Sequence, residues 1–122
     1  MIQRFQPGPR MSQIVTYPAS AHMVVISGQV PDNRALDVPG QTADVLAKVD
    51  RLLAEAGTDK SRITHAYIWL RDIADFDLMN GEWDKWVSPG NAPARACVEA
   101  RMAAPDIRVE IQVFALAANG AE

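Results

Sequence analysis

The chain has 122 residues, of which 48% are hydrophobic and 22% are charged, and its formal net charge at pH 7 is -3. This length and balance predict one folded domain, residues 1–122, and exclude an intrinsically disordered chain. The slightly acidic charge and the absence of any Lys/Arg run argue against a general affinity for nucleic acid.

No stretch approaches the roughly 20 apolar residues that cross a bilayer, and residues 1–10 lack the apolar segment of a secretory signal. We therefore expect a cytoplasmic protein without a membrane partner. The single cysteine, Cys97, excludes an intramolecular disulfide and suits a reducing compartment. His22, His65 and Cys97 are far apart in the sequence and form no zinc-ligand spacing, so we expect no metal site.

The first half of the chain predicts two strands and a helix. Residues 23–27 are apolar and largely β-branched and stop at Gly28, which predicts a short buried strand, with residues 11–17 as its expected hairpin partner. From Gln41 to Ala56 the apolar residues recur at spacings of three and four, which predicts an amphipathic helix that Gly57 ends.

The second half predicts three strands and a second helix. Residues 62–71 are rich in β-formers, residues 73–87 carry an aromatic and apolar stripe at helical spacing, and residues 94–101 and 107–116 complete the strands. The order β-β-α-β-α-β-β favours an α+β fold in which two helices cover one face of one sheet.

Alternation along the strands predicts what each face of this sheet carries. Ile107, Val109, Ile111 and Val113 are expected under the helices. The opposite side, called here the uncovered face, is expected to hold Tyr67, Trp69, Phe114, Arg95, Cys97, Glu110 and Gln112. So aromatic and charged a surface favours a homo-oligomer with polar clefts at its seams, while a monomer with a solvated face is the alternative.

Arg95 and Glu110 are the residues that best suit chemistry. Arg95 lies at the start of a strand after a Pro-containing loop, where a guanidinium can bind a carboxylate through two parallel hydrogen bonds. If its strand shares a sheet with the last strand, Glu110 can face the same side and act on water as a base or proton shuttle. A surface ion pair between the two, without function, is the plain alternative.

The other reactive or aromatic side chains are assigned to packing. Cys97 on the strand of Arg95 is expected to be a small buried hydrophobe rather than a nucleophile, because neither histidine is near in sequence. His22 and His65 are expected to pack or hydrogen-bond, and Trp83 and Trp86 follow helical spacing.

Five segments together resemble the RidA/YjgF family, also labelled endoribonuclease L-PSP. They are SGQVP at 27–31, QTADVLAKVDRLLAEAG at 41–57, DIADFDLMN at 72–80, PARACVEA at 93–100 and VEIQVFA at 109–115. The resemblance implies a chorismate-mutase-like fold, a homotrimer formed through the uncovered faces, and hydrolytic deamination of enamines and imines to 2-oxo acids and ammonia in clefts between subunits. No cofactor is implied.

The resemblance also implies roles for individual residues. Arg95 would hold the substrate carboxylate and Glu110 would help to position water, while Ser27, Gly28, Asn80 and Cys97 would line the cleft. This chain reads GPRMSQ where many members have GPYSQ, which places Met11 at the position of a cleft tyrosine, and Ala92 is smaller than the usual aromatic residue. These changes predict a divergent pocket.

Two further functions compete with deamination. A non-catalytic regulatory protein would use the same clefts to bind a small carboxylate. A ribonuclease or translation inhibitor, a label carried by relatives, is disfavoured by the acidic balance and the lack of a basic, aromatic-studded surface.

Overall fold

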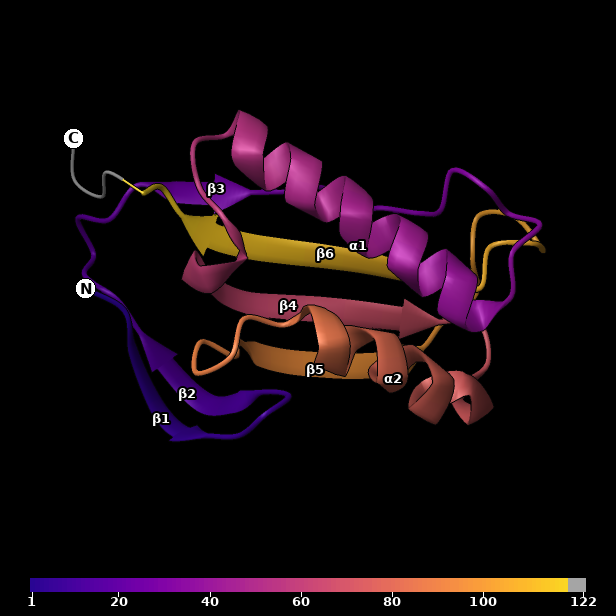
Figure 1. Ribbon diagram of the computed structural model, residues 1–122, viewed down its shortest axis with the longest axis horizontal. Coiled ribbons are helices and arrows are strands. Elements are labelled where there is room, and N and C mark those ends of the chain that lie inside the picture. Colours follow the sequence, from indigo (N-terminus) through magenta and orange to yellow (C-terminus); the bar gives the residue numbers. More distant parts are fainter. Residues whose placement is uncertain (119–122) are drawn as a thin grey trace.

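The computed structural model describes residues 1–118; residues 119–122, which the predicted domain included, lie outside the described part. A four-stranded sheet carries two helices on one face, and a separate hairpin lies beside its edge (Figure 1). The elements in chain order are β1 (Gln3–Pro7), β2 (Ser12–Thr16), β3 (Met23–Val25), α1 (Val38–Glu55), η1 (Lys60–Arg62), β4 (Ile63–Leu70), η2 (Ile73–Asp75), α2 (Phe76–Trp86), β5 (Ala94–Glu99) and β6 (Val109–Leu116).

The sheet has the strand order β3-β6-β4-β5. β4 pairs in parallel with β5 and antiparallel with β6, and β6 pairs antiparallel with β3. The parallel pair requires a crossover, and α2 supplies it. The predicted α+β class, with two helices over one sheet, is confirmed.

The prediction for the N-terminal strands was wrong. Residues 11–17 were expected to pair with residues 23–27, but β2 pairs with β1, and β3 pairs with β6. Arg4 explains how the hairpin is held, because its guanidinium donates to the carbonyls of Ala92 (3.0 Å), Ser61 (3.1 Å) and Ile63 (3.1 Å). These partners are distant in sequence, so no local pattern predicts the arrangement.

Helix α1 begins three residues before the predicted Gln41. Asp37 caps it by accepting a hydrogen bond from the backbone N–H of Gly40 at 2.9 Å, and Pro39 occupies the first turn, where its missing N–H has no cost. The predicted end is confirmed, since Gly57 has φ 81, a left-handed conformation that favours glycine.

A buried amide ties α1 to the loop before β6. The side chain of Gln41 is fully buried, and its Nε2 donates to the carbonyls of Arg34 (3.1 Å), Leu36 (3.2 Å) and Asp106 (2.9 Å). Its Oε1 accepts the backbone N–H of Arg108 at 2.8 Å. The two N–H groups of Nε2 are shared among the three carbonyls, so both of its donors and its oxygen have partners.

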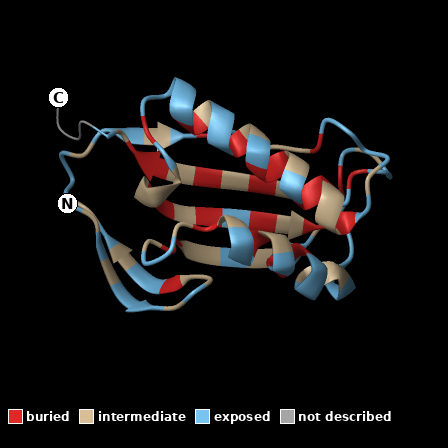
Figure 2. Cartoon of the chain, in the orientation of Figure 1, coloured by how far each residue is buried: buried red, intermediate tan, exposed pale blue. Residues whose placement is uncertain are grey.

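The core lies between the helices and the sheet (Figure 2). Its least exposed members come from α1, α2 and the central strands: Val45, Val49, Leu53, Ile68, Leu70, Met79, Trp83, Val109, Ile111, Val113 and Ala115. The predicted burial of alternate residues in β6 is confirmed, as is the stripe of α2, which begins at Phe76 after the 3-10 turn η2.

The uncovered face is aromatic, as predicted. It carries Val25, His65, Tyr67, Trp69, Ala94, Ala96, Val98, Glu110, Gln112 and Phe114. The rings of His65 and Phe114 stack with centroids 4.2 Å apart, and Tyr67 meets Phe114 edge-on at 5.9 Å. Tyr67 remains 42% exposed and Val98 52% exposed, so this surface is apolar and open in the single chain.

Among residues 1–118, no helix combines the length and apolar character that a bilayer span requires.

Candidate functional site

Arg95 lies on the helix-covered side of the sheet, contrary to prediction. Its register partner on β4 is Ala66, which in turn opposes Val113, and both of these are buried core residues. Paired residues in a sheet point to the same side, so Arg95 projects toward α2. The prediction placed Arg95 on the uncovered face and therefore its neighbours Ala94 and Ala96 under the helices, but these two alanines lie on the uncovered face.

Helix α2 builds a cradle for the Arg95 guanidinium. Nη1 donates to Oδ1 of Asn80 at 2.7 Å, and Cζ lies 5.1 Å from the ring of Trp83 and 5.9 Å from the ring of Phe76. Burial lowers the pKa of Arg95, which nevertheless stays a cation at neutral pH. Within the described residues no carboxylate lies at ion-pair distance from it, so the charge is available to a ligand.

Asn80 adds an unused donor beside this cation. The residue is 1% exposed, and its Nδ2 has no acceptor in the part of the chain that the structure describes. Its orientation follows from the bond to Arg95, because only the amide oxygen can accept from a guanidinium. An unsatisfied buried N–H is costly, and Asn80 Nδ2 is the one buried side-chain polar atom without a partner among the described residues.

Cys97 also lies on the helix-covered side and not on the uncovered face as predicted, because its register partner is Ile68 of the core. Burial raises the pKa of its thiol, although the charge of Arg95 acts in the opposite direction. A thiol with a raised pKa is protonated at neutral pH and is a poor nucleophile. The assignment of Cys97 to packing is therefore supported.

Met11 belongs to the segment that borders the start of β5. The next residue, Ser12, is bound to the carbonyl of Pro93 through its backbone N–H (2.9 Å) and to the carbonyl of Ala92 through Oγ (2.6 Å). Ala92 is itself buried. Met11 thus lies near Arg95 in the fold, although the two are far apart in sequence. We refer to Arg95, Asn80, Cys97, Met11, Trp83 and Phe76 as the Arg95 cluster.

Glu110 forms a second group with Ser27 and Gly28, called here the Glu110 cluster. Glu110 pairs with Trp69 across the sheet on the uncovered face. The next residue, Ile111, exchanges backbone hydrogen bonds with Gln29, which follows Gly28 in the chain. A Cβ atom on Gly28 would collide with the Glu110 carboxylate, so a larger residue here would displace the end of that side chain. Ser27 beside it is exposed.

The two clusters do not meet within one subunit. Strand β4 separates β5 from β6, Arg95 projects from the helix-covered side, and Glu110 projects from the uncovered face. The predicted approach of Arg95 and Glu110 on one face was therefore wrong for the single chain, and so was the alternative of a surface ion pair between them.

His65 has the packing role that was predicted for it, whereas His22 is exposed. Nδ1 of His65 lies 2.9 Å from the hydroxyl of Thr64, and its ring stacks on Phe114. Burial lowers the pKa of His65, which favours the neutral ring.

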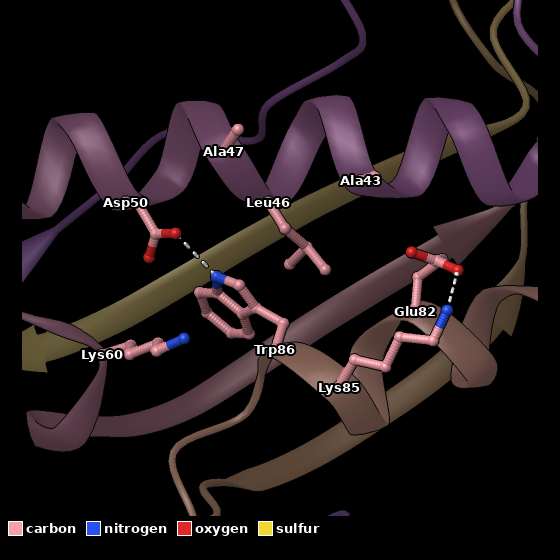
Figure 3. A pocket seen from close by; sticks show the side chains of 8 residues that line it. All are labelled: Ala43, Leu46, Ala47, Asp50, Lys60, Glu82, Lys85 and Trp86. Atoms are coloured by element: carbon pink, nitrogen blue, oxygen red, sulfur yellow. Dashed lines mark hydrogen bonds and ion pairs between the residues drawn. The ribbon is translucent and has the colours of Figure 1, made fainter.

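Two surface hollows lie away from the Arg95 cluster. One of about 270 Å³ runs between α1 and α2, where Trp86 Nε1 donates to Asp50 at 3.0 Å and Lys85 pairs with Glu82 at 3.0 Å (Figure 3). Its polar groups largely satisfy one another. Another, of about 400 Å³, lies beyond the far end of β5 and is lined by Arg71, Glu99, Ala100 and Arg101. In the described residues, no three metal-binding side chains gather at one place.

Comparison with known proteins identifies the family. The sequence pattern of the family described as endoribonuclease L-PSP matches residues 1–117. This chain belongs to that family, the YjgF or RutC family. A YjgF-family crystal structure from Neisseria meningitidis has 48% sequence identity and a TM-score of 0.77, covering 96% of this chain and 95% of that one.

Curated relatives of this YjgF-family protein support the same family assignment. A "RutC family protein" from Haemophilus ducreyi is 44% identical over 115 residues, 94% of this chain and 96% of the relative. A protein from Escherichia coli named 2-iminobutanoate/2-iminopropanoate deaminase is 29% identical over 102 residues, 78% of this chain and 80% of the relative.

Sequence reasoning missed the roles of four residues at the Arg95 cluster and its border. Trp83 and Phe76 were placed only on the aromatic and apolar stripe of residues 73–87, although they also flank the guanidinium. The ion pair of Arg10 with Asp84 joins residues 74 positions apart and has no local signal.

Proposed function

We propose that this YjgF-family protein hydrolyses reactive enamines and imines derived from amino acids to 2-oxo acids and ammonia. The observation that carries the proposal is Arg95, a half-buried cation with no carboxylate partner among the described residues, next to the unused Nδ2 donor of Asn80. Together they suit a carboxylate, which accepts hydrogen bonds at both of its oxygens. The name of the Escherichia coli relative supports the choice of substrate class.

We infer that the complete site needs two subunits of a homotrimer in the cytoplasm. The open aromatic surface that includes Tyr67 and Val98 suits burial against other copies of the chain. Such packing would bring the Glu110 cluster of one subunit toward the Arg95 cluster of its neighbour. The opposite placement of Arg95 and Glu110 supports this arrangement, because one subunit alone does not unite them.

The chemistry then requires little machinery. A protonated imine is electrophilic at carbon, and water adds there while Glu110 accepts a proton from it. Glu110 then returns this proton to the nitrogen of the tetrahedral adduct. The adduct expels ammonia, which takes up the hydroxyl proton as the 2-oxo acid forms, so one water is consumed for each imine. Arg95 and Asn80 hold the carboxylate in place, and positioning of this kind supplies a large share of the rate.

The first test is release of ammonia or 2-oxo acid from an imine that an amino-acid oxidase generates in situ. We expect Arg95→Ala to lower kcat/KM at least ~100-fold, and Arg95→Lys to recover little, since lysine lacks the planar fork. Arg51→Ala, on the exposed side of α1, is the control and should retain activity. Equal rates for the wild type and Arg95→Ala would remove Arg95 from the mechanism.

A second test addresses the shared site. Arg95→Ala and Glu110→Gln chains are each expected to be inactive, but co-expression should restore about a quarter of the wild-type sites if every site takes one residue from each of two subunits. No recovery in purified mixed trimers would show that both residues act from the same subunit.

The non-catalytic alternative has one observation in its favour: the Arg95 cluster by itself contains a carboxylate anchor but no base. A protein that binds a 2-oxo acid through Arg95 yet shows no turnover with any imine, and for which Glu110→Gln leaves affinity unchanged, would establish that alternative.

A further inference from the structure

An ion pair borders the Arg95 cluster. Nε of Arg10 donates to Oδ1 of Asp84 at 2.8 Å, and Nη2 donates to Oδ2 at 2.8 Å, which is the two-pronged geometry of a strong pair. The side chains are 39% and 40% exposed, so the pair lies where a ligand entering from solvent can meet it. Arg10 comes from the loop before β2, and Asp84 comes from α2.

The pair is connected to Arg95 through one indole ring. Trp83 Nε1 donates to the backbone carbonyl of Arg10 at 2.9 Å, while the guanidinium of Arg95 lies 5.1 Å from the Trp83 ring. After burial and Cys97, the charges of Arg10 and Asp84 are the next influences on the pKa of Arg95, with opposite signs. Both members of the pair are therefore close enough for their charges to act at the site.

Around the carboxylate end of the site, Arg95, Arg10 and Asp84 sum to a single positive charge, while Glu110 acts at the protonated imine carbon. Arg95 contributes one, and Arg10 and Asp84 cancel each other. A substrate with one carboxylate matches this balance, and Arg95 is the group that binds it. A second carboxylate on the substrate would have to displace Asp84 from Arg10, because both prongs of Arg10 are already occupied.

We propose that the Arg10–Asp84 pair determines substrate class by directing the site to 2-imino acids with one carboxylate and an uncharged side chain, and against dicarboxylates. The proposal rests on the deaminase function proposed above for the same site. Arg10 and Asp84 act here as specificity-determining residues, and Arg95 remains the anchor.

The experiment compares kcat/KM for the imines of alanine and of glutamate, each generated in situ. Asp84→Asn frees Arg10, and we expect it to lower the preference for the alanine imine about tenfold, chiefly through a gain on the glutamate imine. The double variant Arg10→Gln/Asp84→Asn restores the single net charge and should return the preference to within about twofold of the wild type.

Glu82→Gln is the matched control. It removes one negative charge from the same helix, but its partner is Lys85, in the hollow between α1 and α2. The preference should be unchanged in this variant. Circular dichroism and thermal melting of each variant separate a charge effect from a loss of folding.

The two proposals fail in different ways. If Asp84→Asn turns over the alanine imine but keeps the wild-type preference, the specificity proposal is overturned and deamination stands. If the wild type turns over neither imine, deamination fails, and calorimetric binding of 2-oxobutanoate and 2-oxoglutarate replaces turnover. The same tenfold shift would then support the specificity role, and an unchanged binding ratio would overturn it.

Discussion

Gln41 and Asn80 are both side-chain amides on helices that face the interior, with 0% and 1% exposure, yet their surroundings differ. The amide of Gln41 donates to three carbonyls and accepts one N–H, all within its own subunit. The amide of Asn80 accepts from Arg95, and its Nδ2 has no acceptor in the described part of the chain. One amide is fully satisfied within the fold, and the other keeps an unused donor next to Arg95.

The two amides are equally buried but differ in how many of their hydrogen-bonding groups have partners. A satisfied buried amide stabilises the loop that it binds, while an unsatisfied one costs about 1–3 kcal/mol. Natural proteins keep such costs mainly where function needs them. Burial alone does not distinguish Gln41 from Asn80, but their hydrogen-bond partners do.

The largest effect is expected for Gln41→Leu. The substitution leaves three carbonyls and one backbone N–H without their partner, so we expect the free energy of unfolding to fall by about 3–5 kcal/mol. Urea denaturation followed by circular dichroism measures this change. A loss below about 1 kcal/mol would mean that water replaces the amide, and the contrast with Asn80 would disappear.

Asn80→Ala should affect function more than stability. The change removes an unsatisfied donor together with one hydrogen bond to Arg95, so we expect the free energy of unfolding to change by less than about 1 kcal/mol. The kcat/KM for imine hydrolysis should fall about 30-fold, equivalent to about 2 kcal/mol. Urea denaturation and the ammonia assay measure the two quantities. An unfolding loss as large as that of Gln41→Leu would assign Asn80 a structural role.

His65 should give a smaller effect than either Gln41 or Asn80. Burial lowers its pKa in the folded protein, so the unfolded chain binds a proton more readily. The contribution of His65 to stability is therefore complete above the pKa of this histidine in the unfolded chain, about 6.5. It is lost as the pH falls through the lower pKa that His65 has in the folded protein. Melting temperatures at pH 7.5 and pH 5.5 test this. His65→Phe should narrow the difference between them, and an unchanged difference would exclude His65 as a contributor.

Local pattern alone was sufficient for most of the architecture. The spacing of apolar residues in α1 and α2, the alternation in β6 and the glycine after α1 predicted the elements, because helical and strand periods are properties of the backbone itself. The aromatic uncovered face followed from the same alternation. Asp37 and Pro39 shifted the start of α1 by three residues, which is a detail of capping.

The orientation of β5 could not be predicted from local pattern. Alternation separates Ala94, Ala96 and Val98 from Arg95 and Cys97, but it does not say which set faces the helices. Apolar content suggested the alanines, whereas the parallel register of β5 with β4 turns Arg95 toward α2. Register between strands that are distant in sequence depends on their packing, which no short segment encodes.

The candidate site divides in the same way. Arg95, Glu110, Ser27, Gly28, Asn80, Cys97 and Met11 were all named from the sequence, with resemblance supplying most of them. The tertiary structure alone decided that they form two clusters on opposite sides of the sheet, and that Arg10, Asp84 and Trp83 surround Arg95. Residue chemistry is carried by single positions, but contact between positions depends on how the whole chain packs.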